Sequence, residues 1–312
     1  TVGRVAMTRA VRILLRLACL GALSFFPMHS QAGANYWFDL LTEDAATAIV
    51  FYSDLFGWET RLFHKGYYLI MQDGQSIGGI AQIEGELAEG NESLWLLAIP
   101  AMDLDDSIDL ARANGGTLHI APEETSMIQR FAMILDPQGA PIILLGSYSA
   151  GLTTPSVNRW VWAELWTGQP EEAAAFYDKL SDIDIDWVRD EETPVGFMSV
   201  AGRDWASITT PPFEGTPELW MPYVLVEDIS KTVDRVKELG GSVLAQVSDN
   251  LREGSLALVA DPTGAAFIVY EDRAAETATS GHRGLGAEFR WGEKYRANGP
   301  VSIGPPSPTQ RP

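Results

Sequence analysis

The sequence is poor in the residues that build disulfide frameworks and transition-metal sites. Its 312 residues include one cysteine and four histidines, and the histidines are far apart, at His29, His64, His119 and His282. A single cysteine excludes a disulfide framework and every site made from a cysteine cluster. A zinc site with several histidine ligands is likewise not expected.

Basic residues are also scarce. Lysine and arginine together number 22, against 42 aspartate and glutamate residues, which gives a formal net charge of −20. A chain this acidic repels phosphate backbones, so nucleic acid is excluded as an expected partner. The remaining composition is that of a globular protein, with 46% hydrophobic and 21% charged residues. A chain of this length corresponds to about two domains.

The first 34 residues have the pattern of a signal peptide. After Met7, three arginines precede a short apolar run at 17–26, and small residues follow up to Ala34. A basic segment, a short apolar segment and small residues near a cleavage point are typical of an export signal. The apolar run is shorter than the roughly 20 residues that cross a bilayer, so no integral membrane span is predicted. We therefore expect residues 1–34 to be removed and the mature chain to be periplasmic or extracellular.

The rest of the chain contains a tandem repeat. Trp37-Phe38-Asp39-Leu40-Leu41-Thr42 recurs 125 residues later as Trp162-Ala163-Glu164-Leu165-Trp166-Thr167. The same offset relates further residues, namely Phe51 and Tyr52 to Phe176 and Tyr177, Trp95 to Trp220, Gly115-Gly116 to Gly240-Gly241, and Asp136-Pro137 to Asp261-Pro262. We take this offset as constant over about 110 residues, which indicates an internal duplication.

Each copy has the pattern strand, helix and three strands, twice over. The apolar positions Ala48, Phe51, Tyr52 and Leu55 have the spacing of a helix that packs on a sheet, and Asp44 and Gly57 are its expected start and stop. In the first copy we expect strands at 36–42, 59–63, 66–72, 77–83, 94–99, 117–121, 128–135 and 140–146, with a second helix at 104–114. The predicted domains are 35–147 and 158–273, joined by a linker at 148–157 and followed by a flexible Gly/Pro-rich tail at 274–312.

These motifs resemble those of the vicinal oxygen chelate superfamily, which includes glyoxalases, bleomycin resistance proteins and extradiol dioxygenases. The similar features are the opening Trp-x-Asp/Glu-Leu-x-Thr, the helical Phe-Tyr, the Gly-Gly pair and the Asp-Pro-x-Gly turn, over about 35–147 and 158–272. The resemblance is to the two-copy bacterial type. It implies an α+β fold of tandem domains, in which four βαβββ modules form cup-shaped curved sheets with helices outside.

The resemblance also implies where metal ligands would stand in metal-dependent members. Those positions fall on Trp37, Leu96 and Ile143 in the first copy and on Trp162, Met221 and Ile268 in the second. None of these side chains is an ordinary ligand of a hard or borderline metal. We therefore predict no metal site, no cofactor and no catalytic residue. The Lewis-acid chemistry of the superfamily would lack its central component.

Strand alternation predicts what lines the cups instead. If Trp37 points inward, then Asp39 and Leu41 do too, while Phe38 and Leu40 pack under the helix. By the same parity Trp162, Glu164 and Trp166 line the second cup, and Ile143, Leu145, Ile268 and Tyr270 come from the final strands. The candidate ligand-binding residues are Trp37, Asp39, Trp162, Glu164, Tyr223 and Tyr270.

An aromatic wall with one carboxylate suits a planar, apolar or cationic compound. The leading hypothesis is therefore an exported, metal-independent, glyoxalase- or bleomycin-resistance-like protein that binds such a small molecule. One alternative is a metal-dependent lyase, isomerase or dioxygenase, and another is metal-free general-base catalysis by Asp39 or Glu164. A third is a structural or interaction module in which the tryptophans simply fill the cups. Dimerisation, with or without exchange of copies between chains, is left open.

Overall fold

The computed structural model describes residues 36–84, 93–122, 130–146, 156–180, 183–188, 194–200, 203–212, 215–245 and 255–272. The predicted signal peptide, the tail and most of the linker lie outside these residues. Within the described part, no helix is both long enough and apolar enough to cross a membrane.

The described chain forms two eight-stranded sheets with the same strand order. The first copy comprises β1 (Trp37–Thr42), α2 (Ala45–Phe56), β2 (Glu59–His64), β3 (Tyr67–Gln72), β4 (Gln75–Gln82), β5 (Leu94–Ala101), α3 (Leu104–Ala113), β6 (Thr117–Ile120), β7 (Phe131–Leu135) and β8 (Pro141–Gly146). The second comprises β9 (Trp160–Trp166), α4 (Pro170–Leu180), β10 (Asp184–Val188), β11 (Val195–Val200), β12 (Arg203–Thr209), β13 (Leu219–Val226), α5 (Ile229–Glu238), β14 (Ser242–Ala245), β15 (Leu256–Ala260) and β16 (Ala266–Glu271). The four predicted βαβββ modules are confirmed.

Local sequence signals account for the ends of the helices. The Asp44 carboxylate accepts a hydrogen bond from the Thr47 N–H and caps α2. Gly57 ends this helix in the left-handed conformation, with φ of 71°, which a residue without Cβ adopts at little cost. Pro170 stands at the first position of α4, where a missing N–H leaves no intrahelical bond unmade.

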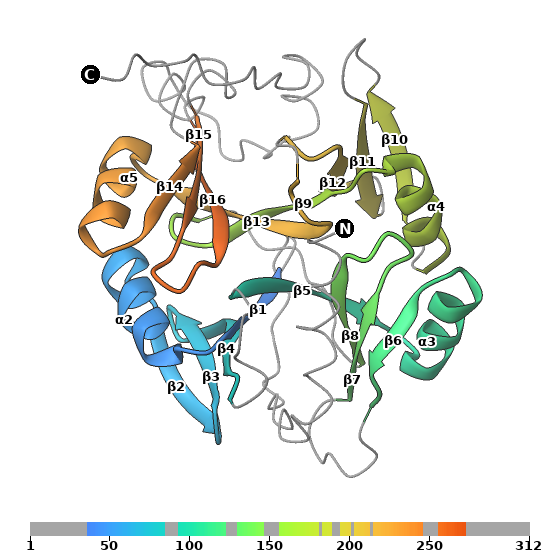
Figure 1. The fold of residues 1–312 in the computed structure, drawn as a ribbon, viewed down its shortest axis with the longest axis horizontal. Helices are drawn as coiled ribbons and strands as arrows, with labels where there is room; N and C mark the ends of the chain where they lie inside the picture. Colours follow the sequence, from blue (N-terminus) through green and yellow to red (C-terminus); the bar gives the residue numbers. More distant parts are fainter. Residues whose placement is uncertain are drawn as a thin grey trace, which may run out of the picture.

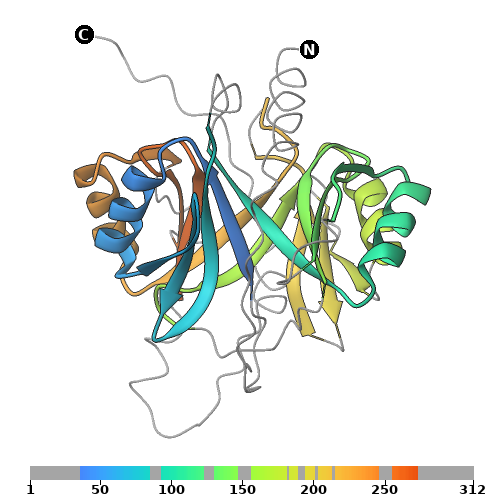
Figure 2. The ribbon, with the colours of Figure 1, turned by 90° about the horizontal axis from the view of Figure 1, so that it is seen from below.

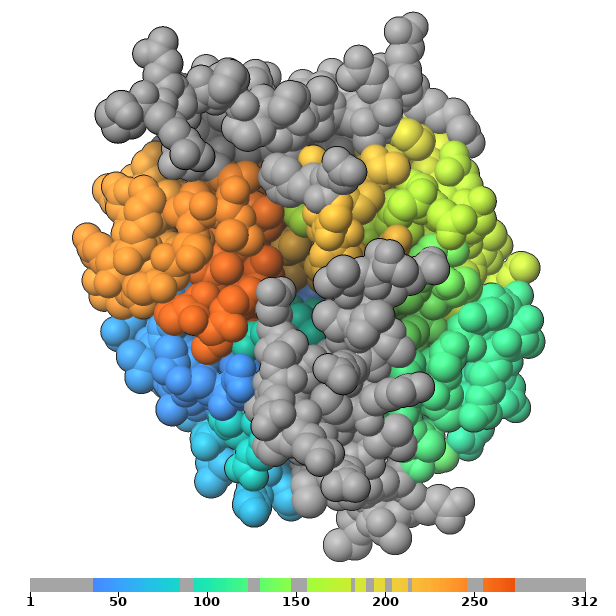
Figure 3. All heavy atoms as spheres, viewed as in Figure 1, coloured from blue at the N-terminus to red at the C-terminus, as the bar shows by residue number. Residues whose placement is uncertain are grey.

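The two copies pack against each other through the helix-bearing faces of their sheets. Helix α2 contacts α5 at one end of the molecule and α3 contacts α4 at the other (Figures 1 and 2). On the surface, the last module of the second copy lies against the first module of the first copy (Figure 3). One apolar core, which includes Phe38, Trp95, Trp160, Phe176 and Phe267, spans both copies.

This contact is reciprocal at the glycine pairs. A Cβ at Gly116 would lie 3.2 Å from the ring of Phe176, and a Cβ at Gly241 would lie 3.1 Å from the ring of Phe51. Each phenylalanine belongs to the first helix of the other copy. The second glycine of each Gly-Gly pair therefore provides the space that the partner copy's ring needs.

The aspartate of each Asp-Pro turn also faces a tyrosine hydroxyl of the other copy. Asp136 Oδ1 accepts hydrogen bonds from three backbone N–H groups of its own turn, and its Oδ2 accepts one from the Tyr177 hydroxyl of the other copy at 3.0 Å. The Tyr177 hydroxyl in turn accepts the Trp220 indole N–H at 2.9 Å. Burial raises the pKa of Asp136 to about 6, although these hydrogen bonds act in the opposite direction.

The matching hydrogen-bond network, in which Asp261 of the second copy faces Tyr52 and Trp95 of the first, is less complete. Tyr52 accepts the Trp95 indole N–H at 3.0 Å and faces Asp261. Burial raises the pKa of Asp261, and the nearby Tyr52 hydroxyl is among the groups that lower it. Nevertheless, Asp261 Oδ2 is buried without a hydrogen-bond partner, so the geometry shows an approach rather than a formed bond. The two interdomain networks thus differ in strength.

The start of the second copy is also fixed to the first. The Asn158 side chain donates to the Phe56 carbonyl, the Arg159 guanidinium donates to the Gln72 side chain and carbonyl, and the Trp160 indole donates to the Ile77 carbonyl. These bonds join residues of one chain. Within the described residues, they favour pairing of the two copies in the same chain.

One prediction about the repeat is wrong. Asp39 pairs with Gly79, whereas Glu164 pairs with Ser207, so β4 and β12 are related by an offset of 128 (207 − 79) rather than 125. Counted between register-matched residues, the second copy has three more residues from Trp187 to Val195 than the first has from Leu62 to Tyr67. It has three fewer from Thr209 to Leu219 than the first has from Ala81 to Leu94. The two changes cancel, so a comparison of the outer motifs does not reveal them.

We expect Tyr177→Phe to lower the free energy of unfolding by about 1–3 kcal/mol, because Asp136 and Trp220 both lose a buried partner. Urea denaturation measures the change. Tyr68→Phe is the matched control, because Tyr68 is half-buried and its hydroxyl makes no hydrogen bond within the described residues. Equal losses in the two variants would show that the interdomain bond contributes nothing.

Candidate ligand-binding cups

The inward faces of the two sheets form two separate apolar clusters. The first contains Trp37, Leu41, Ile143 and Leu145, and the second contains Trp162, Trp166, Tyr223, Ile268 and Tyr270. Phe38 and Leu40 lie in the shared core on the opposite face. The predicted alternation is therefore confirmed in both copies. We call the two inward faces the first cup and the second cup.

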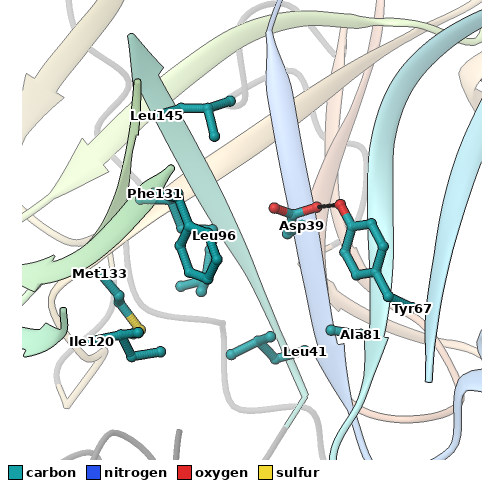
Figure 4. A pocket seen from close by; sticks show the side chains of 10 residues that line it. Asp39, Leu41, Tyr67, Ala81, Leu96, Ile120, Phe131, Met133 and Leu145 are labelled. Carbon is teal, nitrogen blue, oxygen red and sulfur yellow. Dashed lines mark hydrogen bonds between the residues drawn. The ribbon is translucent and has the colours of Figure 1, made fainter. Parts of the chain in front are cut away.

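In the first cup, Asp39 lies at the centre of a small polar group. Asp39 Oδ1 accepts a hydrogen bond from the Tyr67 hydroxyl at 2.7 Å and one from the Trp37 indole N–H at 3.1 Å. No hydrogen bond to Asp39 Oδ2 is formed by any of the described residues. Figure 4 shows this second oxygen turned away from Tyr67, toward the apolar wall that includes Leu96, Phe131 and Leu145. It is the atom that a ligand in the cup would meet.

The environment of Asp39 changes its acidity. The side chain is 8% exposed. Burial raises the pKa of its carboxyl group to about 6, and the hydrogen bonds from Tyr67 and Trp37 offset only part of this effect. Protonated and ionised forms of Asp39 are therefore both accessible near neutral pH.

A pocket opens beside Asp39. Its cavity volume is about 30 Å³, and it lies within a wider hollow of about 480 Å³ that includes open solvent. Its lining consists of Asp39, Leu41, Tyr67, Ala81, Leu96, Ile120, Phe131, Met133, Ile143 and Leu145. The wall is thus apolar except for one carboxylate and one phenol. This chemistry suits a small, mainly apolar compound that carries a hydrogen-bond donor or a positive charge.

In the second cup, both oxygens of the carboxylate are engaged. Glu164 Oε1 accepts the Trp166 indole N–H at 2.8 Å and the Tyr223 hydroxyl at 2.9 Å. Its Oε2 accepts the Ser207 hydroxyl at 2.8 Å, and the Ser207 oxygen accepts the Trp162 indole N–H at 2.9 Å. Each buried acid thus accepts hydrogen bonds within its own cup, and different residues donate them in the two cups.

Sequence reasoning missed Tyr67 and Ser207. With the offset of 125, Tyr67 has no recognisable counterpart. The strand register instead aligns Tyr67 with Val195 and Gly79 with Ser207. A Cβ at Gly79 would lie 2.1 Å from the Tyr67 hydroxyl oxygen, so this glycine makes room for the bond from Tyr67 to Asp39. The alternation of β3 was a usable signal for Tyr67, but nothing local indicates Ser207.

The chemistry at the metal-ligand positions implied by the resemblance does not fit a metal. Trp37 directs its indole N–H to Asp39, while Leu96 and Ile143 contribute hydrocarbon to the cup. An indole N–H is a donor without a lone pair in the ring plane, and alkyl groups have no lone pairs at all. Among the described residues, no three histidine, cysteine, aspartate or glutamate side chains are grouped to hold a metal ion.

The two histidines within the described residues do not line the pocket beside Asp39. His64 lies at the exposed end of β2, and His119 lies half-buried in β6, where burial lowers its pKa.

Comparison with known families agrees with this architecture. The model of the glyoxalase/bleomycin resistance protein/dioxygenase superfamily matches residues 36–144, and the model of a glyoxalase-like domain matches residues 162–270. The chain belongs to this superfamily. It contains two of its domains in tandem, as the sequence pattern predicted.

Two groups of relatives span most of the chain. CFP32 of Mycobacterium bovis, a protein provisionally named a glyoxylase, is 27% identical over 249 residues, which cover 77% of this chain and 95% of the relative. The anthracycline biosynthesis protein DnrV of Streptomyces peucetius is 29% identical over 271 residues, which cover 80% of this chain and 97% of DnrV.

Solved structures share the fold at low identity. A Mn(II)-bound glyoxalase from Novosphingobium aromaticivorans has a TM-score of 0.53 at 13% identity, over 78% of this chain and 83% of the other. An extradiol ring-cleaving dioxygenase from Brevibacterium fuscum has a TM-score of 0.54 at 12% identity, over 80% of this chain and 75% of the other. These likenesses establish the fold of this superfamily member.

The raised pKa of Asp39 predicts a definite pH dependence of stability. The native state binds the proton more tightly than the unfolded chain, so the free energy of unfolding falls as the pH rises through about 6. Between pH 5 and pH 7 the loss from this group is about 1 kcal/mol. Asp39→Asn removes it, and urea denaturation at the two pH values measures the difference from the wild type. Asp54→Asn, which removes an exposed carboxylate from α2, controls for net charge; a wild-type-like slope in Asp39→Asn would contradict the assignment.

Proposed function

We propose that this protein binds a small, mainly apolar compound in the first cup, without a metal ion, and that Asp39 anchors the compound. The observation that carries the proposal is the geometry of Asp39. One of its oxygens is held by Trp37 and Tyr67, and the other faces an open, apolar pocket without a partner among the described residues. A buried carboxylate in this state gains most from a ligand that supplies a donor or a positive charge.

The relatives support a role in small-molecule handling. DnrV is named for anthracycline biosynthesis, and anthracyclines are planar aromatic compounds, the chemical type that an aromatic and aliphatic wall accommodates. A binding role fits the donor set of the first cup better than metal-dependent catalysis, because the positions of the expected ligands hold an indole and alkyl groups.

A second candidate is metal-free catalysis with Asp39 as a general base. It is favoured by one observation: burial brings the pKa of Asp39 to about 6, near the value that suits proton abstraction at neutral pH. The described pocket lining offers one other polar side chain, Tyr67, and its hydroxyl already donates to Asp39. A reaction that develops charge on an oxyanion would therefore lack a second donor there. Binding remains the better supported function.

The place of action is part of the proposal. The basic and apolar segments before Ala34 suit an export signal, and the remaining chain has no cysteine, which suits an oxidising compartment. Fractionation of an expressing bacterium, followed by N-terminal sequencing of the protein, tests this. A chain found in the cytoplasm with the residues before Ala34 still attached would contradict export.

Benzylamine is a suitable first probe of the first cup, because it combines one aromatic ring with one cation. We expect Asp39→Asn to weaken its binding about tenfold or more, since a charge-assisted hydrogen bond is lost. Ala81→Leu, which places extra volume in the pocket lining, should also weaken binding. Calorimetric titration measures both. Glu164→Gln is the control in the second cup and should leave the affinity unchanged; equal affinity in Asp39→Asn and the wild type would contradict the anchor.

Metal analysis distinguishes the proposal from the metal-dependent alternative. We expect residues 35–312, purified without an affinity metal and offered Zn, Fe, Ni, Mn and Co, to retain less than about 0.1 metal per chain after desalting, because the side chains at the expected positions are poor ligands. Elemental analysis gives the ratio. One or two equivalents of tightly held metal would restore a metal-dependent activity to first place.

A further inference from the structure

Side chains of different size stand at matching strand positions in the two cups. Several positions carry a larger side chain in the second cup, among them Leu41 and Trp166, Leu69 and Phe197, Gly79 and Ser207, Ala81 and Thr209, Ala98 and Tyr223, and Leu145 and Tyr270. Others carry a smaller one, among them Tyr67 and Val195, Ile120 and Ala245, and Phe131 and Leu256. The larger residues of the second cup include Trp166, Ser207 and Tyr223, which donate hydrogen bonds to Glu164.

Ala98 and Tyr223 occupy the same place in their sheets. Ala98 is opposite Trp37 on β1 and beside Ile143 on β8, while Tyr223 is opposite Trp162 on β9 and beside Ile268 on β16. From this place Tyr223 sends its phenol across the second cup to Glu164, and the side chain is 2% exposed. In the first cup, the side chain at this place ends at Cβ.

The pocket of the first cup lies next to this position, although Ala98 itself is not among its lining residues. Leu96, two residues from Ala98 on β5, and Ile143, directly beside Ala98, both line the pocket next to Asp39. Asp39 is also one methylene shorter than Glu164, which leaves further room above it. The phenol of the second cup thus comes from β13, at a place where the first cup has only a methyl group; the phenol of the first cup, Tyr67, comes from β3 and donates to Asp39 Oδ1.

We propose that Tyr223 occupies the second cup as a tethered phenol, and that the first cup takes a free ligand that presents an aromatic hydroxyl group to Asp39 Oδ2. The part about the first cup rests on the function proposed above and names the chemical class of its ligand. The aromatic ring would lie against Leu96, Ile143 and Leu145, and the O–H group would complete the hydrogen bonding of the carboxylate.

p-Cresol tests the second cup, because it is the side chain of tyrosine as a free molecule. In an Ala98→Tyr background, which fills the first cup, Tyr223→Ala should create a site that binds p-cresol about tenfold more tightly than toluene, since only p-cresol donates to Glu164. Ala98→Tyr alone should bind neither compound. Equal binding of p-cresol and toluene to the double variant would overturn the role of Tyr223.

The first cup is tested in the wild type by calorimetric titration with the same pair. p-Cresol should bind about tenfold more tightly than toluene, and Asp39→Asn should remove this preference while leaving toluene binding unchanged. Ala98→Tyr, which places a tethered phenol in the first cup, should abolish binding of both compounds. It also provides a test that does not depend on the folding of Tyr223→Ala.

The outcomes separate this inference from the proposed function. If benzylamine binds in an Asp39-dependent manner but p-cresol has no advantage over toluene, the cup binds ligands and the phenol class is wrong. If neither p-cresol nor benzylamine binds the wild type, the proposed function of the first cup fails, while rescue of Tyr223→Ala by p-cresol would still support the tethered phenol. Unimpaired p-cresol binding to Ala98→Tyr would overturn the equivalence of positions 98 and 223.

Discussion

The packing of one sheet's helix-bearing face against the other determines the rest of the structure. Each copy alone would expose a layer of aromatic side chains, and burying these rings in a shared core removes a large apolar area from water. Reciprocal contacts then fix the alignment, with each first helix supplying a phenylalanine over the other copy's glycine. Because this interface uses one face of each sheet, the cups are confined to the opposite faces, where they do not share side chains.

The residues that carry the family resemblance belong mainly to this interface rather than to the cups. The helical Phe-Tyr, the Gly-Gly pair and the Asp-Pro turn meet there, together with Trp95 and Trp220. In this chain, these motifs therefore indicate how the two domains pack against each other. The chemistry of the cups depends on positions that the motif does not specify, which explains how the fold is retained without the expected metal ligands.

The sequence was sufficient for the modules, the element boundaries to within a few residues and the inward direction of Trp37, Asp39, Trp162 and Glu164, since all of these follow from local periodicity. It was insufficient for the partners of the two carboxylates. Tyr67 and Ser207 reach the cups because of how their strands pair with β1 and β9. For these strands, the residues that match between the copies are 128 apart in the sequence and not 125. Such a change results from loop lengths and long-range pairing, which no local pattern records.

The compensating length changes around β11 and β12 have a consequence for how such a protein diverges. A longer connection before this hairpin and a shorter one after it leave the first helices, the Gly-Gly pairs and the Asp-Pro turns at their original spacing, while the hairpin side chains that face each carboxylate differ between the copies. A duplicated domain of this kind can thus exchange the donors around its carboxylate without a substitution in the surface that holds the copies together. Ligand preference and domain assembly become separate inheritable traits within a single polypeptide.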